Sequence, residues 1–401
     1  MNQTIASQQT LATKQRILSI DILRGIVMMI MAIDHIRDFI HIHGMDQDPT
    51  SLASTSPAVF FTRFITHYCA PIFVFLSGTS IYLQAQRKSK KELSVFLFKR
   101  GLWFMFAEIV IVNLLMTFNP LYNFVMLQVI WVIGLSMVLM SAIIYLPFRA
   151  ILVISIALIF GHNLLDQFNY PDPTKTPIWF AILHQQAFIE YAPMHFLAIA
   201  YPIIPWVGVM MLGFCLGKWY GKEYNASKRQ KQLMWTGFAT ILFFIVLRYS
   251  NLYGDPSKWA IQLRGNAFSI ISFFNVTKYP PSLLYCCITL GPALIALSLL
   301  EKTSAEWTRK VSVFGRVAFY YYLWHFFLVH LTCVVFFFAS GKGVKDIIDY
   351  NSPFLFRNMQ WGYPLWVVYA VWVVFMFILY PICKKYDRYK STHKNWWLSY
   401  L

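Results

Sequence analysis

Long apolar runs recur along the whole chain, and each is close to the length that crosses a lipid bilayer as a helix. A spanning helix needs about 20 mostly apolar residues, because the hydrocarbon core is about 30 Å thick and a helix rises about 1.5 Å per residue. The runs therefore predict an all-α, polytopic membrane helical bundle. We expect about ten transmembrane helices, near residues 19–41, 59–84, 96–117, 121–146, 150–166, 196–219, 232–250, 281–300, 312–338 and 363–383.

The composition agrees with lipid as the main solvent. Hydrophobic residues make up 58% of the chain and charged residues 13%, whereas a soluble domain has about 25% charged residues. The aromatic content of 18% suits a membrane protein, because Trp and Tyr collect at both interfaces. No internal repeat is evident, so the inverted-repeat plan of many transporters has no support.

The distribution of lysine and arginine predicts the orientation. Most of the 34 basic residues fall in alternate loops and in the C-terminal tail, and the positive-inside rule then places both termini in the cytoplasm. We expect a polar cytoplasmic lead at 1–18, a transmembrane domain at 19–383 and a basic cytoplasmic tail at 384–401. The lead lacks a cleavable signal pattern. The net charge of +17 is read as a topology signal and an attraction to anionic lipid, not as nucleic-acid binding.

The six cysteines have irregular spacing and lie mostly inside predicted spans. They fit neither a disulfide framework nor a zinc pattern, and most are expected to be small buried apolar residues. They are Cys69, Cys215, Cys286, Cys287, Cys333 and Cys383.

Ionisable residues at membrane depth are the informative ones, since each costs several kcal/mol unless it is paired or hydrated. The first predicted span continues after its apolar middle into Asp34, His35, Arg37 and Asp38. Arg37 lies one helical turn past Asp34 and is placed to pair with it. The second span begins with Arg63 and His67, four residues apart, so the two clusters can face each other across a short loop.

Three interpretations apply to these clusters. His41, His43 and Asp46 are best explained as a solvated helix end, whereas Asp34, His35 and His67, which lie deeper, favour a functional site. A carboxylate with several histidines also suits Zn or Fe, but no fixed ligand spacing supports a metal. Five further polar residues in the predicted spans are weaker candidates: Glu108, Asn113, Gln128, His325 and His330. Hydrogen bonding between helices is the favoured role for Asn113, Gln128 and His330. For Glu108 and His325, that role and a functional role are equally favoured.

The segment from Lys278 to Ser282 reads Lys-Tyr-Pro-Pro-Ser. Two consecutive prolines cannot lie inside a helix, because the second disfavours the α conformation at the first. We expect a rigid outer start to the eighth span. The preceding segment 266–279 is too short to cross the bilayer and is expected at the interface or as a re-entrant piece.

Four stretches together resemble the heparan-α-glucosaminide N-acetyltransferase family, most closely its bacterial branch, over residues 19–330. They read SIDILRGIVMMIMAIDHIRDFIH, FFTRFITHYCAPIFVFLSGTSIYL, NVTKYPPSLLYCCITLGPAL and FGRVAFYYYLWHFFLVH. The resemblance implies a transmembrane acyltransferase that moves acetyl from cytoplasmic acetyl-CoA to a sugar amine on the far side. Aligned without gaps from Asp21, the catalytic histidine of the lysosomal member falls on Asp46, with His41 and His43 nearest to it.

Acyl transfer assigns roles to these positions, because a thioester needs a base for the attacking group and donors for the oxyanion. We predict His35, or failing that His67, as the base, oriented by Asp34 or Asp38. The acceptor or the oxyanion would be contacted by Arg37, Asp38, Arg63, Lys278 and Tyr279. The phosphates of acetyl-CoA, the co-substrate, would meet cytoplasmic cations, and no metal is expected; the candidate cations are Arg24, Lys99, Arg100 and Arg316.

A membrane transporter or permease for a sugar or anion is the rival function, because buried Asp, His and Arg groups also serve proton relays. Against it, the polar groups gather at one outer end rather than at the midplane. The expected partners are a sugar or glycan acceptor and membrane lipids, with a homodimer left open. The expected location is the bacterial inner membrane.

Overall fold

The computed structural model describes residues 17–400 and confirms the polytopic helical membrane fold. Residues 1–16 of the predicted lead lie outside this range. The principal helices are α1 (Leu18–Ile40), α2 (Pro57–Thr66), α3 (Cys69–Ala85), α4 (Lys90–Ala107), α5 (Asn113–Thr117), α6 (Val129–Ile143), α7 (Phe148–Gly161), α8 (Ile178–Leu183), α9 (Ile203–Leu216), α10 (Ala226–Ser250), α11 (Asn266–Phe274), α12 (Leu283–Leu300), α13 (Glu306–Arg316), α14 (Ala318–Ala339) and α15 (Leu365–Thr392). Short turns are η1 (Glu108–Val112), η2 (His162–Phe168), η3 (Pro173–Lys175), η4 (Gly217–Tyr220), η5 (Val344–Asp346) and η6 (Trp396–Ser399).

Seven helical stretches of the described chain are long and apolar enough to cross a membrane. They correspond to seven of the ten predicted spans. The other three predicted spans fall on α1, on α4 with its continuation through η1 and α5, and on α6. These are either rich in charged residues or short, so length and apolar composition alone do not mark them. The count of ten stays a prediction.

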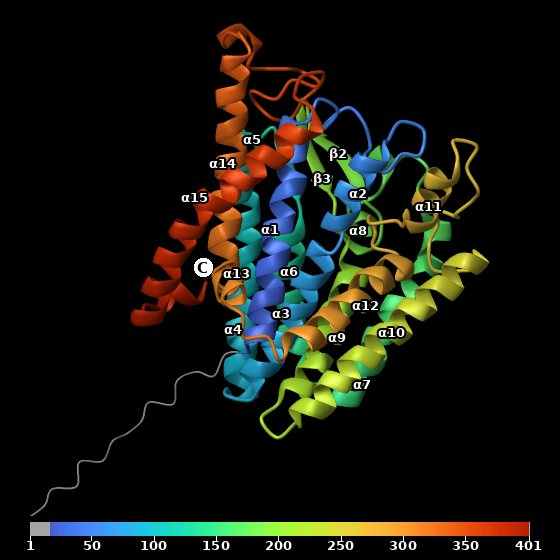
Figure 1. The fold of residues 1–401 in the computed structure, drawn as a ribbon, viewed down its shortest axis with the longest axis vertical. Helices are drawn as coiled ribbons and strands as arrows, with labels where there is room; N and C mark the ends of the chain where they lie inside the picture. Colours follow the sequence, from blue (N-terminus) through green and yellow to red (C-terminus); the bar gives the residue numbers. More distant parts are fainter. Residues whose placement is uncertain (1–16, 401) are drawn as a thin grey trace, which may run out of the picture.

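The bundle has two distinct ends (Figure 1). The start of α1 and the α3–α4 and α9–α10 connections lie at the lower end of the view, which carries the basic loops. The strands, α11 and the α14–α15 connection lie at the other end. We call these the basic end and the opposite end. If the basic end is cytoplasmic, as predicted, the opposite end is extracytoplasmic.

Helices α3 and α9 cross with their backbones in contact. A Cβ atom on Gly78 would lie 1.9 Å from the Met210 carbonyl oxygen, and one on Gly213 would lie 1.9 Å from the Phe75 carbonyl oxygen. Only glycine permits this approach, which is how membrane helices pack closely without a hydrophobic driving force between them. The crossing fixes the position of α3, which contributes walls to both cavities described below.

The second predicted span is interrupted rather than continuous. Helix α2 ends at Thr66 and α3 begins at Cys69, with His67 and Tyr68 between them. The physical cause is Pro71, because proline lacks an N–H and its ring clashes with the carbonyl of the residue four positions earlier, here His67. The freed His67 carbonyl accepts a hydrogen bond of 2.7 Å from the Tyr285 hydroxyl.

A small sheet caps the opposite end and was not predicted. Strand β1 (Phe124–Leu127) pairs in parallel with β3 (His195–Ile199), which pairs antiparallel with β2 (Ala187–Ala192). The helix predicted from residue 121 therefore begins only at Val129. A short apolar run fits a strand as well as a helix, and the partner strand lies about 70 residues away in the sequence.

The structure agrees with a short helix before residue 279 and with a helix start after the two prolines, while the interfacial and outer placement of these segments stays a prediction. Helix α11 has only 9 residues, too few to cross the bilayer, and it packs beside α2. Helix α12 begins directly after Ser282, whose hydroxyl accepts a hydrogen bond of 3.0 Å from the Tyr285 N–H.

Candidate active site

A cavity of about 310 Å³ lies near the opposite end of the bundle, and we call it the outer cavity. It collects predicted site residues from three separate parts of the chain: α1, α2 and the loop before α12. These residues are Asp34, His35, Arg37, Asp38, Arg63, Lys278 and Tyr279. The structure thus brings seven of the predicted residues together around one hollow.

Asp34 is the centre of a buried charge cluster. Its carboxylate forms one ion pair with Arg37, with Nη2 2.9 Å from Oδ1, and another with Arg63. Arg37 in turn reaches Asp38 Oδ1 at 2.6 Å. The side chains of Asp34 and Arg37 are 9% and 3% exposed, so these charges balance one another in a setting where an unpaired charge is costly. The predicted Asp34–Arg37 pairing is confirmed.

His35 points away from this ion pair. Its ring lies 4.4 Å from the Phe326 ring and 5.2 Å from the His325 ring, centroid to centroid. Adjacent residues on a helix project about 100° apart, so a contact between Asp34 and His35 is not favoured by helix geometry. Asp34, one of the two carboxylates expected to orient His35, instead pairs with two arginines. The ring neighbours of the imidazole come from α14, and orientation by Asp38 stays a prediction.

The loop that carries Lys278 and Tyr279 is fixed from behind by Asp255. This buried carboxylate accepts from the Ser282 hydroxyl at 2.6 Å and from the Thr277 N–H at 2.8 Å. Lys278 Nζ lies 5.0 Å from the centre of the Tyr279 ring. Burial alone would raise the pKa of the Tyr279 phenol, but Lys278 and Arg63 hold it below its ordinary value. Tyr279 also lines the outer cavity.

Other histidines near this end lie outside the cavity wall. His67 is buried in the α2–α3 interruption with its ring 5.4 Å from that of Tyr285, and it does not line the outer cavity. His43 lies 3.2 Å from Asp46 through its Nδ1, on an exposed loop. The position that aligns with the catalytic histidine of the lysosomal member therefore belongs to a solvated pair in this chain.

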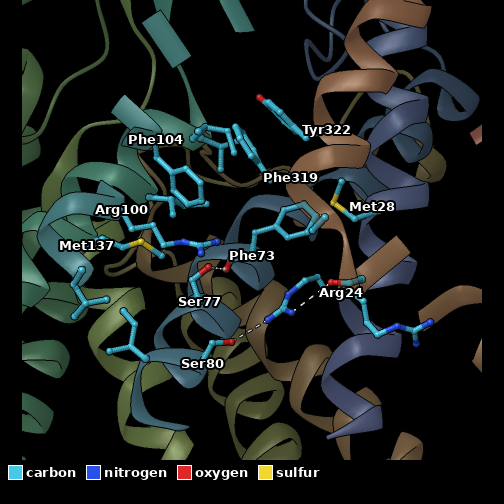
Figure 2. A pocket seen from close by; sticks show the side chains of 18 of the residues that line it. Arg24, Met28, Phe73, Ser77, Ser80, Arg100, Phe104, Met137, Phe319 and Tyr322 are labelled. Atoms are coloured by element: carbon cyan, nitrogen blue, oxygen red, sulfur yellow. Dashed lines mark hydrogen bonds between the residues drawn. The ribbon is translucent and has the colours of Figure 1, made fainter. Parts of the chain in front are cut away.

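A second cavity of about 210 Å³ lies toward the basic end, and we call it the inner cavity. Its lining includes three of the four predicted phosphate-binding cations, Arg24, Arg100 and Arg316, and also Lys390. Figure 2 shows the Arg24 and Arg100 side chains on two sides of this hollow, below Tyr322. The fourth predicted cation, Lys99, is exposed and does not line it. One residue of separation turns it to another face of α4.

The lining cations differ in how they are engaged. Arg24 donates to the Ser80 hydroxyl at 3.1 Å and lies 3.6 Å from Asp21. Arg316 forms a close ion pair of 2.6 Å with Asp387. Arg100 donates to the Ser399 carbonyl and lies 4.9 Å above the Phe104 ring. Among residues 17–400, Arg100 has no carboxylate partner, so its charge is the least neutralised of the three.

The outer and inner cavities are adjacent. Phe73, Val129 and Tyr322 line both of them, and we call these three shared side chains the neck. The Tyr322 hydroxyl is buried and has no hydrogen-bond partner within the described part of the chain. The neck is therefore where the inner cavity lies beside the cavity that contains His35.

Several lining residues were not predicted. Tyr201, in the turn before α9, packs its ring 5.4 Å from Tyr279, and Tyr322 forms the neck. Both sit in apolar runs where a tyrosine is indistinguishable from an interfacial anchor. The predicted bonding role of His330 is confirmed, because its two ring nitrogens lie 2.7 and 2.8 Å from the Met116 and Leu355 carbonyls.

All six cysteines are free and buried, as predicted. Within residues 17–400, no group of three or more His, Cys, Asp or Glu side chains is arranged to hold a metal ion.

The bundle and its two adjacent cavities define an integral, multi-pass membrane protein with charged side chains gathered around both cavities. The model of the catalytic part of heparan-alpha-glucosaminide N-acetyltransferase matches residues 16–250, more than half of the chain. The chain belongs to this family, and it is a transmembrane acetyltransferase. A search of curated protein sequences found no significant match. Lys278, Arg316 and Tyr322 lie beyond the matched region yet complete the same cavities.

Proposed function

We propose that this protein transfers acetyl from cytoplasmic acetyl-CoA to the amine or hydroxyl of a sugar or glycan on the extracytoplasmic side. The observation that supports the proposal is the pair of adjacent cavities, which share Phe73, Val129 and Tyr322 in their walls. One cavity offers cations at the basic end, and the other offers a histidine and a charge cluster at the opposite end. The long, thin pantetheine arm of CoA suits the passage between them.

The donor would bind with its phosphates at the inner cavity. A phosphate is a strong acceptor for guanidinium groups, and Arg100 is best placed because no carboxylate side chain of residues 17–400 forms an ion pair with it. Arg24 and Arg316 add positive potential while they stay tied to Asp21 and Asp387. The acetyl thioester would then lie beyond the neck, near His35.

The acceptor would bind in the outer cavity. Asp38, whose side chain is 32% exposed, remains accessible to a sugar hydroxyl or ammonium group. The family name supports a glucosamine-like acceptor. Lys278, Tyr279 and Arg63 face the same space and would contact the acceptor or the oxyanion that forms on the thioester carbonyl.

His35 would act as the general base. It takes a proton from the acceptor amine as the nitrogen attacks the carbonyl carbon, and a tetrahedral oxyanion forms. When the intermediate collapses, the C–S bond breaks, and the CoA thiolate leaves through the neck and receives a proton. His35 is favoured over His67 because it lines the outer cavity and His67 does not. The packing of His325 and Phe326 against its ring would hold the imidazole in position.

Sealed proteoliposomes test the proposal. Acetyl-CoA with a labelled acetyl group is added on the side of the basic end, and glucosamine or a glycan panel is enclosed on the other side. We expect labelled N-acetyl sugar inside, identified by mass spectrometry, and no product when both substrates are on the opposite side alone. Uptake of unmodified sugar without any acetyl transfer would instead establish the transporter. The same preparation, made from inner membranes of a bacterial host, tests the proposed location.

A further inference from the structure

A large apolar groove lies outside the active site, between α7 and α10. Its volume is about 700 Å³, and α3, α9 and α12 form its floor. Side chains that line it include Phe75, Leu152, Ile156, Phe243 and Leu290. It shares no lining residue with the outer or inner cavity, so it is a separate feature of the fold.

The groove is open to the membrane. Ile156, Phe160 and Phe243 line it and are 43%, 44% and 39% exposed. Helices α7 and α10 are both weakly covered by the rest of the chain, since 28% and 22% of their most apolar windows are buried. A hydrocarbon chain that fills the groove would meet apolar side chains along its length.

The groove continues into a basic pocket at its basic end. A cavity of about 430 Å³ is lined by Ser227, Lys228, Lys231 and Gln232, and it shares Thr236 with the groove. A third lysine, Lys218, lines the groove itself, with its Nζ 4.9 Å above the Phe148 ring. These three lysines form no ion pair with a carboxylate among the described residues.

A buried carboxylate in this region already has an ion-pair partner. Glu301, which is 8% exposed, is bound by Arg229 on the same helix as Lys228 and Lys231, with Arg229 Nε at 2.9 Å. The positive charge of the two lysines therefore remains available. An elongated apolar groove that ends in unneutralised cations matches one chemistry: an acyl chain bearing an anionic headgroup.

We propose that the groove and the basic pocket form a binding site for an anionic phospholipid of the leaflet at the basic end. The headgroup phosphate contacts Lys228 and Lys231, Lys218 lies at the level of the glycerol ester groups, and an acyl chain lies between α7 and α10. The lipid covers the outer side of α3 and α9, whose close crossing at Gly78 and Gly213 supports the inner cavity. Its expected effect is on stability rather than on chemistry.

The headgroup part of the site is tested with a double variant, Lys228→Ala with Lys231→Ala, in lipid nanodiscs or detergent. Native mass spectrometry measures retention of phosphatidylglycerol and of phosphatidylcholine with the same acyl chains. A lysine near the membrane surface is worth about fivefold in affinity for anionic lipid, so the pair should lose about 25-fold for phosphatidylglycerol. Phosphatidylcholine binding should be weaker than phosphatidylglycerol binding in the wild type and unchanged in the variant. The matched control, Lys222→Ala with Lys302→Ala, removes two basic-end lysines that lie outside the groove and should change neither.

The apolar part is tested with Ala239→Trp, which places an indole inside the groove. It should reduce retention of long-chain phosphatidylglycerol but leave binding of the short-chain, dihexanoyl form unchanged. Equal retention of both headgroups by the wild type, or an unaltered affinity in the double lysine variant, would overturn the proposal. So would a loss of acetyl-CoA affinity in that variant, because the lysines would then belong to the donor site. Acetyl transfer at an unchanged rate in the double variant is the expected companion result.

Discussion

Replacing Asp34 by Asn should destabilise the protein more than any other single change in the outer cavity. The carboxylate forms ion pairs with Arg37 and Arg63. Of these two arginines, only Arg37 also contacts a second carboxylate, that of Asp38, at 2.6 Å. The amide has nearly the same size as the carboxylate, so the change removes charge and leaves the volume unaltered. Arg63 loses its ion-pair partner while its side chain stays only 13% exposed.

The magnitude follows from the burial of the pair. Removing one partner of a buried ion pair costs about 3–5 kcal/mol, because the other charge is left uncompensated. We expect about 3 kcal/mol, at the lower end, since Asp38 still holds Arg37 and the cavity gives Arg63 some access to water. For a chain of 401 residues, that corresponds to a fall of about 4 °C in the melting temperature, because the entropy of unfolding grows with chain length.

The assay is thermal unfolding of the purified protein in nanodiscs, followed by tryptophan fluorescence. Asp46→Asn is the matched control, because Asp46 pairs with His43 on an exposed loop and its loss should cost less than about 0.5 kcal/mol. If Asp34→Asn melts within about 1 °C of the wild type, the charge-balance reasoning is refuted. If the variant instead keeps the wild-type melting temperature and loses acetyl transfer, Asp34 acts in catalysis rather than in stability.

Three further changes test separate parts of the site. His35→Ala should slow acetyl transfer about 10²–10⁴-fold, the usual cost of losing a general base, while calorimetry should show unchanged acetyl-CoA binding. If only His67→Ala shows this loss of rate, the general base is His67 instead. Arg100→Ala should raise KM for acetyl-CoA more than it lowers kcat, whereas Lys99→Ala should change neither; equal effects of the two would remove the donor from the inner cavity. A cysteine at position 90 should react with an impermeant reagent only from the cytoplasmic side, and labelling from outside intact cells would reverse the orientation.

Local rules predicted much of the helical framework and part of the site. Span length located α3, α9 and α12, and helical spacing predicted that Arg37 would pair with Asp34. Ser282 was expected to begin a helix because two prolines precede it. Each of these inferences depends on residues a few positions apart, where the helix itself fixes the geometry.

The parts that were missed depend on contacts between distant segments. Tyr201 comes from the turn before α9 to pack against Tyr279, and Tyr322 comes from α14 to line both cavities. Nothing in the local sequence around either tyrosine separates it from an interfacial anchor. The ring neighbours of His35 were also missed: the sequence named Asp34 or Asp38 as the carboxylate that orients it, whereas His325 and Phe326 of α14 pack against the imidazole. Which helix packs against a given residue depends on the fold of the whole bundle.

The neck has a consequence for the energetics of the cell. A continuous water-filled path through the bilayer would leak protons and dissipate the electrochemical gradient. Phe73 and Val129 are apolar, Tyr322 contributes one hydroxyl, and none of the three carries a charge at neutral pH. An apolar constriction of this kind resists wetting and blocks ions, while the neutral thioester arm of the proposed donor can pass. Tightness to ions and the size of the group transferred are thus set by the same three side chains, a coupling that no soluble acetyltransferase has to satisfy.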